Sequence, residues 1–110
     1  MNNNSKHHIY LIQDEIYFKI GYTYKSPKLR LDELQIGNPR ILTLINTYNC
    51  VDGKGLEFLL HRHFHTKHVI GEWYQLDEND VDNFIETCNK LNTNLSVLNE
   101  NYYFKNKIYN

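Results

Sequence analysis

Short apolar runs near the N-terminus alternate with polar positions as β-strands do. Residues 9–12 form the first run and residues 16–20 form the second, with an acidic pair between them. In the second run Ile16, Phe18 and Ile20 share one face, because successive side chains of a strand point to opposite faces of the sheet. The pattern predicts a β-hairpin built from these two runs.

Two longer stretches carry the signals of helices. Ser26 is a good N-cap and Pro27 suits the first helical position, while Gly37 is a good C-terminal stop. These residues predict a short helix over residues 27–36. Residues 54–65 also carry apolar side chains at helical spacing, which predicts a second helix there.

The rest of the chain predicts one more helix and two short strands. Residues 40–48 alternate like a buried strand, and residues 72–76 resemble a short aromatic strand. Cap candidates at residues 77–79 precede an apolar stripe over residues 81–91, which predicts a third helix. The aromatic residues within 95–110 indicate that this tail packs, either as an added strand or on a partner.

The order of these elements, β-β-α-β-α-β-α, predicts an α+β fold. We expect a small mixed sheet of three to four strands flanked by about three helices. The length of 110 residues fits one domain over residues 1–110. Within it, we expect residues 1–7 to be disordered and residues 95–110 to form a C-terminal extension.

Composition narrows the class of protein. The hydrophobic fraction of 41% is enough for one modest core, and no apolar run is long enough to span a membrane. No segment resembles a secretory leader. Cys50 and Cys88 lie far apart in the sequence, as expected for reduced thiols. These features predict an intracellular protein, cytoplasmic or nuclear.

The charges are segregated along the chain although the net charge is only -1. Residues 19–67 contain eight Lys or Arg against four Asp or Glu, whereas residues 68–110 contain three against seven. The basic middle permits a local face for nucleic acid on a near-neutral protein. Chance segregation on a solvated surface would give the same counts, so charge alone does not decide.

Five polar residues on these elements suit phosphodiester chemistry. In chain order they are Tyr10, Lys19, Arg30, Glu57 and His61. An arginine fork can grip two phosphate oxygens, and one carboxylate can hold Mg²⁺ that keeps most of its waters. A nearby tyrosine, lysine or histidine can take a proton from the attacking water. Glu57 and His61 stand one helical turn apart, hence on one face.

Five segments carry a resemblance to a known family between residues 8 and 76. They read I-Y-L-I, F-K-I-G-Y-T, R-L-D-E-L-Q-I-G-N-P-R, L-E-F-L-L-H-R-H-F and G-E-W-Y. Together they resemble the phage- and virus-type branch of the GIY-YIG nuclease superfamily. The resemblance implies a DNA endonuclease that uses one divalent ion, Mg²⁺ or Mn²⁺. Since a domain of 110 residues shows no evident specificity module, we expect cutting that is selective for DNA structure or only weakly selective for sequence, or help from a homodimer or a partner protein.

The resemblance assigns roles to the same residues. Tyr10 would activate or orient water, Arg30 would stabilise the phosphate, and Glu57 would be the single metal ligand. His61 would lie next to the metal or the phosphate, and Lys19 stands in the second motif. We further expect three substrate contacts, at Gly21, Lys28 and Arg40.

Two departures from the family pattern leave alternatives open. His8 replaces the glycine of the first motif, and Lys19 replaces the tyrosine of the second. The general base can therefore be Tyr10, Lys19 or His61. The second departure also allows a catalytically degenerate DNA-binding module on the same fold. A weaker alternative is a regulatory or protein-interaction domain that uses the aromatic tail.

Each candidate also has an ordinary structural explanation. Taken alone, Tyr10 is a half-buried strand residue, Arg30 a solvated helix residue, and Glu57 with His61 a surface pair. Trp73 suits core packing better than base stacking.

A histidine run raises one further possibility. The run contains His61, His63, His65 and His68. A zinc site would need a fourth ligand, and no cysteine lies nearby, so the pattern favours helix-surface histidines.

Overall fold

The computed structural model describes the backbone of residues 6–109 and the side chains of residues 6–97. Its strands are β1 (His7–Asp14), β2 (Tyr17–Thr23), β3 (Thr43–Cys50), β4 (His68–Ile70) and β5 (Trp73–Tyr74). Its helices are α1 (Pro27–Ile36), α2 (Gly53–His63), α3 (Glu78–Asp82) and α4 (Phe84–Tyr109), with a 3-10 turn at His65–Lys67. The strands form one sheet in the order β3-β1-β2-β5-β4.

This architecture confirms the predicted α+β class. All the strand pairs of the sheet are antiparallel, so the prediction of a mixed sheet is wrong. The sheet also has five strands, one more than the upper limit we expected. The extra strand is β4, which pairs with β5 to form a very short second hairpin.

The N-terminal hairpin forms as predicted, with a shifted turn. β1 begins at His7, inside the segment we expected to be disordered, while residues 1–5 lie outside the described part of the chain. Glu15 adopts a φ of 56° in the turn, a left-handed conformation that non-glycine residues adopt mainly in turns. Ile16 therefore belongs to the turn and is 55% exposed. Phe18 and Ile20 are buried together, as expected.

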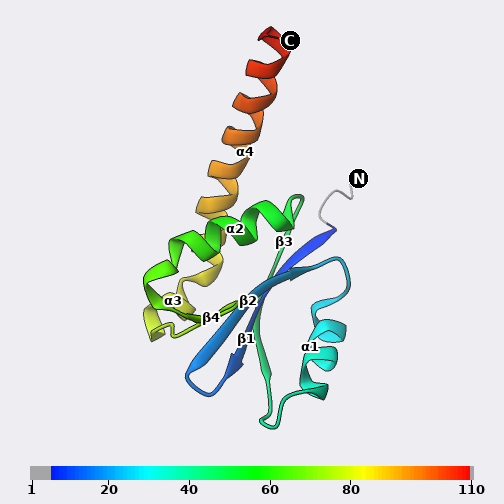
Figure 1. Ribbon diagram of the computed structural model, residues 1–110, viewed down its shortest axis with the longest axis vertical. Coiled ribbons are helices and arrows are strands. Elements are labelled where there is room, and N and C mark those ends of the chain that lie inside the picture. The colour runs from blue at the N-terminus through cyan, green and yellow to red at the C-terminus, as the bar shows by residue number, and fades with distance from the viewer. Residues whose placement is uncertain (1–5, 110) are drawn as a thin grey trace.

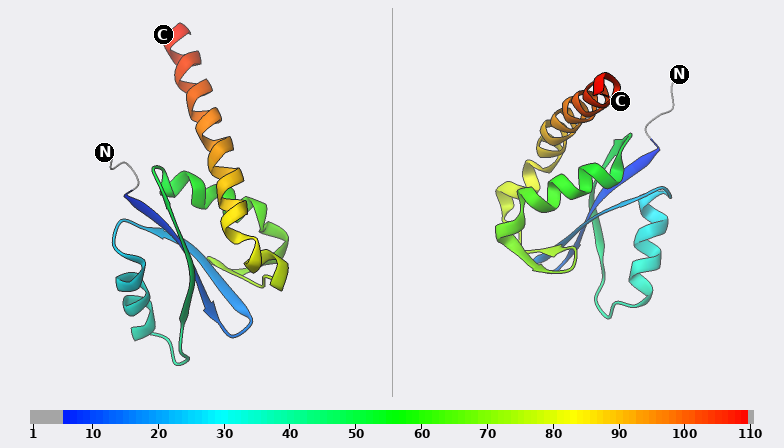
Figure 2. Two further views of the ribbon diagram at one scale, coloured as in Figure 1. Left: turned by 180° about the vertical axis from the view of Figure 1, so that it is seen from behind. Right: turned by 45° about the horizontal axis from the view of Figure 1, so that its top comes forward.

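Helices cover both faces of the sheet (Figure 1). On one face α1 packs over Tyr10, Ile12 and Leu42. On the other face α2 and α4 enclose the larger core, as the second view of Figure 2 shows. That core contains the side chains Ile9, Leu11, Phe18, Ile20, Cys50, Leu56, Leu60, Phe64, Tyr74, Leu76, Phe84 and Cys88.

Helix α1 has the bounds that the sequence predicts. The Ser26 hydroxyl accepts a hydrogen bond from the Leu29 amide at 3.1 Å, and Pro27 occupies the first turn. Helix α2 starts in the same way, because the Asp52 carboxylate accepts from the Gly55 amide at 2.8 Å. These caps fix the residue at which each helix begins.

The predicted third helix is two helices separated at Asn83. A capping box between Asp77 and Asp80 starts α3, and the Asn83 amide donates to the Asn79 carbonyl at its end. Helix α4 then continues to Tyr109, so the added strand considered for residues 95–110 is wrong. Packing of those aromatic side chains on a partner stays a prediction, since they lie outside the described side chains.

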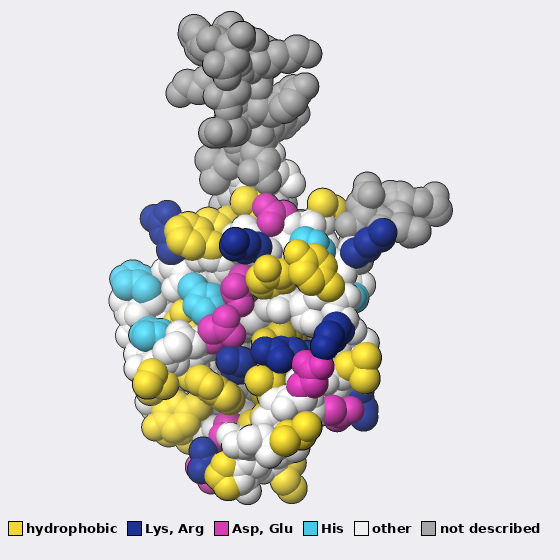
Figure 3. Space-filling model, turned by 45° about the vertical axis from the view of Figure 1, so that its right-hand side comes forward, with side chains coloured by type: hydrophobic (Ala, Val, Ile, Leu, Met, Phe, Trp, Pro, Cys, Tyr) yellow, Lys and Arg dark blue, Asp and Glu magenta, His cyan; other side chains and the backbone are white. Residues whose placement is uncertain are grey.

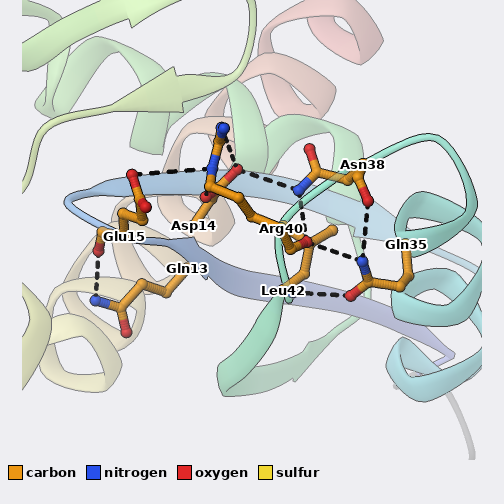
Figure 4. Close-up of polar contacts among 7 residues, drawn as sticks. All are labelled: Gln13, Asp14, Glu15, Gln35, Asn38, Arg40 and Leu42. Carbon is orange, nitrogen blue, oxygen red and sulfur yellow. Dashed lines mark hydrogen bonds and ion pairs between the residues drawn. The ribbon is translucent and has the colours of Figure 1, made fainter.

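A polar cluster fastens the loop after α1 to the tip of the hairpin (Figure 4). Arg40 donates to both carboxylate oxygens of Asp14, at 2.7 and 3.0 Å, and Asn38 donates to the same carboxylate at 3.3 Å. Gln35 accepts from the Leu42 amide at 2.8 Å. This cluster delays the start of β3 to Thr43, three residues after the predicted start.

Among the described residues, no helix is both long and apolar enough to cross a bilayer. Cys50 and Cys88 are both buried and unpaired, and burial raises the pKa of each thiol, to about 11 and about 12. They serve as core side chains.

Candidate active site

The site forms where β2 continues beyond its short partner β5. β5 pairs only with Phe18 and Lys19, which leaves the next residues of β2 at an open edge. There the Ile20 amide donates to the Glu72 carbonyl at 3.1 Å, and His61 Nε2 donates to the Ile20 carbonyl at 3.0 Å. The Glu57 carboxylate accepts from the backbone of Tyr22. Side chains of α2 thus satisfy the sheet edge and are held beside β2.

Tyr10 reaches this edge from the neighbouring strand. It stands opposite Gly21 in the β1–β2 register, and its side chain is only 1% exposed. A Cβ on Gly21 would lie 2.9 Å from Tyr10 Cε1 and still closer to its hydroxyl, so only glycine leaves room for this ring. Gly21 of the second motif therefore leaves the space that Tyr10 of the first motif occupies.

Arg30 lies between Tyr10 and a glutamate of its own helix. Its guanidinium donates to Glu33 at 3.1 Å and also bonds to the Tyr10 hydroxyl. Burial raises the pKa of the Tyr10 phenol, and the bond from Arg30 only partly offsets that effect. The phenol therefore keeps its proton at neutral pH and acts as a hydrogen-bonding group.

Two carboxylates face each other across the edge of β2. Glu57 comes from α2, and Glu72 comes from the β4–β5 turn, where Gly71 has a φ of 57°. Burial, followed by the repulsion from Glu72, raises the pKa of Glu57 from 4.5 to about 7. Such repulsion is relieved when a cation lies between the two groups.

Lys19 of β2 forms an ion pair with one of these carboxylates. Its ammonium lies 3.1 Å from a Glu72 oxygen and 5.6 Å from the centre of the Trp73 ring. The Lys19 side chain is 14% exposed, so the ring and the carboxylate hold it in one orientation. Trp73 packs on the sheet face beneath α1, which agrees with the predicted packing role.

His61 is fixed by hydrogen bonds at both ring nitrogens. Nε2 donates to the Ile20 carbonyl, so Nδ1 accepts from the Tyr74 hydroxyl at 2.5 Å. Glu57 lies 3.9 Å from Nε2. Neither nitrogen has a lone pair directed at solvent, so His61 positions its neighbours in this arrangement.

The donor set suits a hard divalent cation. Within the described part of the chain, one group can hold a metal ion: Glu57, His61 and Glu72, whose ligand atoms lie within 4.8 Å of one another. Because both His61 nitrogens are engaged, the two carboxylates are the available ligands. Two carboxylate oxygens completed by water and phosphate oxygens match the preference of Mg²⁺ or Mn²⁺, and they do not match zinc.

Several residues predicted from the sequence lie in one region at the edge of β2. Burial raises the pKa of Tyr10, and the charges of Arg30, Glu57 and Glu72 also act on it, so these groups lie near the phenol. A shallow depression lies over the carboxylate pair and is lined by Lys54, Glu57, Phe58, His61, Gly71 and Glu72. On the face in Figure 3, Lys and Arg side chains lie beside Asp, Glu and His side chains in a band across the middle.

Other candidates lie elsewhere. Lys28 is exposed on α1, and Arg40 is paired with Asp14 at the tip of the hairpin. Beyond His61, the histidine run does not converge. His65 bonds to the Arg62 carbonyl and His68 bonds to the Gly71 carbonyl, each through one ring nitrogen.

A comparison with protein-family models matches residues 7–89 to the T5orf172 domain. The chain belongs to the T5orf172 domain family. This family is a phage-associated group of the nuclease type. No curated protein and no solved structure matches the chain.

Within this T5orf172 domain, sequence reasoning missed two site residues. Glu72 and Tyr74 lie in the segment G-E-W-Y, which we expected to be a closing strand with some lining of the site, and neither residue was given a role of its own. The pairing of Lys19 with Trp73 brings the preceding Glu72 to the same edge, and this register is a property of the fold rather than of the local sequence. The matched residues 7–89 include every residue of the site.

Proposed function

We propose that this T5orf172 domain is a metal-dependent DNA endonuclease of the GIY-YIG kind. The observation that carries the proposal is the convergence of Tyr10 and Arg30 with the Glu57–Glu72 carboxylate pair at the open edge of β2. Cations that bind phosphate and carboxylates that bind a metal ion lie within one region there. This combination suits hydrolysis of a phosphodiester.

The cationic residues would hold the scissile phosphate. Arg30 is oriented by Tyr10 and Glu33, so its fork is fixed before substrate arrives. Lys19, paired with Glu72, offers a second cation. Charge develops on the nonbridging oxygens in the transition state, and these two side chains would stabilise it.

The carboxylates would hold the divalent ion. Glu57 and Glu72 are the ligands that the geometry makes available, with His61 fixing the edge of β2 beside them. When bound, Mg²⁺ or Mn²⁺ would act as a Lewis acid on a phosphate oxygen. The cation would also keep Glu57 ionised at neutral pH, against the burial that raises its pKa.

Tyr10 would position the attacking water. Its oxygen accepts from Arg30, so its own proton is free to bond to a water or phosphate oxygen. The raised pKa of the phenol argues against a phenolate base, and His61 has no free lone pair. Lys19 is held as an ammonium beside Glu72 and has no lone pair either. The proton of the attacking water would therefore pass to a phosphate oxygen or to solvent.

A cleavage assay tests the proposal. Supercoiled plasmid, branched DNA and RNA are incubated with the chain in Mg²⁺, in Mn²⁺ and in chelator. We expect metal-dependent cutting of DNA, with losses on the order of a hundredfold or more in Arg30→Ala and Glu57→Ala. Exposed residues of the same type, Arg62→Ala and Glu86→Ala, serve as matched controls and should cut like the parent chain.

A specific observation favours one alternative. Lys19 stands where the second GIY-YIG motif has tyrosine, and Glu72 holds it in an ion pair. A catalytically degenerate module that only binds DNA would retain the same cationic surface. In that case no substrate would be cut in either metal, while binding would persist and weaken as salt rises.

A further inference from the structure

An aromatic cluster lies beside the candidate active site and takes no part in the chemistry proposed for it. His7 and Tyr22 are stacked, with ring centroids 6.0 Å apart and an interplanar angle of 29°. Tyr24 meets both rings nearly at right angles, at 4.7 Å from His7 and 5.9 Å from Tyr22. We call these three residues the aromatic cluster.

His7 and Tyr22 of the cluster pack against the start of α2. The Gly53 amide at the start of α2 donates to His7 Nδ1 at 2.7 Å. A Cβ on Gly53 would lie 2.8 Å from His7 Cβ and 2.9 Å from Tyr22 Cδ2, so glycine permits this close approach. His7 and Tyr22 thus form a packed base against which the Tyr24 ring rests.

Tyr24 is the solvent-facing member of the cluster. Its side chain is 70% exposed, although it comes directly after β2. An isolated exposed tyrosine is common on proteins. Here the exposed ring also lines a depression together with Tyr22, Thr23, Lys25, Arg30 and Glu33.

This depression adjoins the phosphate site through Arg30. The guanidinium lines the depression and also bonds to the buried Tyr10 hydroxyl. Lys25 adds a second cation, held at 2.6 Å by Glu33. Two cations beside an exposed aromatic ring form the combination that binds a nucleic acid strand, whose phosphates meet the cations and whose bases stack on the ring.

We propose that Tyr24 stacks on an unpaired nucleobase of a DNA strand whose adjacent phosphate lies at Arg30. This inference rests on the proposed function and narrows its substrate to DNA with unpaired bases near the cut. Duplex DNA hides its base faces in the stack, so Tyr24 can reach one only where a base is unpaired or turned outward. The ring does not read base identity, because every base has a stacking face.

A binding assay in chelator isolates the base from the phosphates. The full chain is titrated into a short labelled oligothymidylate and into an abasic strand with the same number of phosphates, at fixed salt. We expect the parent chain to prefer the strand with bases. Tyr24→Ala should weaken that binding roughly tenfold and leave abasic binding unchanged, whereas Tyr24→Phe should retain the preference.

Tyr17→Ala is the matched control, since Tyr17 starts β2, whereas Tyr24 follows its end, and Tyr17 lines a separate depression with Asp14 and Arg40. It should retain the preference for bases. Equal affinity of the parent chain for both strands would overturn the inference, as would equal losses on both strands in Tyr24→Ala. Cutting is scored separately in Mg²⁺ and Mn²⁺. A chain that prefers bases but never cuts would refute the proposed nuclease and leave this inference standing.

Discussion

The ring of Tyr10 packs against Gly21 of the adjacent strand. Any side chain at residue 21 would collide with this ring. Tyr10 is almost fully buried, yet its hydroxyl bonds to Arg30, and the charges of Glu72 and Glu57 add to the burial that raises its pKa. The phenol therefore connects the core of the sheet to the polar surface region. A change at Gly21 should disturb the site without removing any of its polar side chains.

Replacement of Gly21 by alanine tests this coupling. The added methyl group should displace the Tyr10 ring and lower the free energy of unfolding by about 1–3 kcal/mol, as overpacking does. DNA cutting should fall more steeply, because the Tyr10 hydroxyl leaves Arg30. Thermal melts and plasmid nicking measure the two effects. Gly37→Ala is the matched control, since a Cβ there meets no atom within 4 Å. Gly21→Ala would disprove the coupling if it cut like the parent chain.

The Glu57–Glu72 pair predicts an unusual dependence of stability on pH. The pKa of Glu57 is raised in the folded chain from 4.5 to about 7, so the folded state binds this proton more tightly than the unfolded state. Its contribution to stability is therefore full below pH 4.5 and is lost as the pH rises through about 7. Glu57→Gln should abolish this loss of stability with rising pH, because glutamine does not titrate.

Melting curves in chelator, recorded from pH 4.5 to 8, compare Glu57→Gln with the parent chain. The variant should gain relative stability as pH rises through this range. At pH 8, Mg²⁺ or Mn²⁺ should raise the melting temperature of the parent chain but not of the variant, because the cation offsets the carboxylate repulsion. A constant difference between the two chains across the pH range would contradict the assigned cause.

His61 should stabilise the edge of β2 as well as the site. His61→Ala would leave the buried Tyr74 hydroxyl and the Ile20 carbonyl without their partner. We expect a loss of about 1–3 kcal/mol in the free energy of unfolding. Tyr74→Phe removes only one of the two bonds and should cost less, about 1 kcal/mol. Chemical denaturation measures both, and equal costs would show that the Ile20 bond contributes nothing.

The sequence predicts the elements whose signals are local. The β1–β2 hairpin, α1 with its Ser26 cap and the apolar stripe of α2 follow from alternation, capping and helical spacing. β5 falls within the strand predicted at residues 72–76, whereas β4 has only three residues, too few for alternation to show. β4 pairs with β5, and β5 pairs with β2, so both strands depend on pairing that is a long-range property.

The same distinction applies to the site. Tyr10, Arg30 and Glu57 stand in recognisable motifs, and the fold brings them together. Glu72 was missed because its approach to Glu57 depends on the β4–β5 turn at Gly71. Asn83 likewise divides an apolar stripe that reads as one helix, since the stripe continues on both sides of the break.

Arg40 can be tested for a structural role against a substrate-binding role. We expected it to contact substrate, but its guanidinium grips Asp14, whose side chain is 6% exposed, with two hydrogen bonds. That pairing lowers the pKa of Asp14, so the stability it gives is present at neutral pH and is lost as the medium becomes acidic. Arg40→Leu would leave a buried carboxylate held only by Asn38.

We therefore expect Arg40→Leu to cost about 1–3 kcal/mol in the free energy of unfolding at pH 7, and clearly less in acid. Its affinity for DNA, measured on the folded fraction, should stay near that of the parent chain. Lys28→Leu is the control, because Lys28 is exposed on α1 and forms no ion pair within the described residues. It should leave stability unchanged. A tenfold loss of DNA affinity in a fully folded Arg40→Leu chain would instead return Arg40 to the substrate-binding surface.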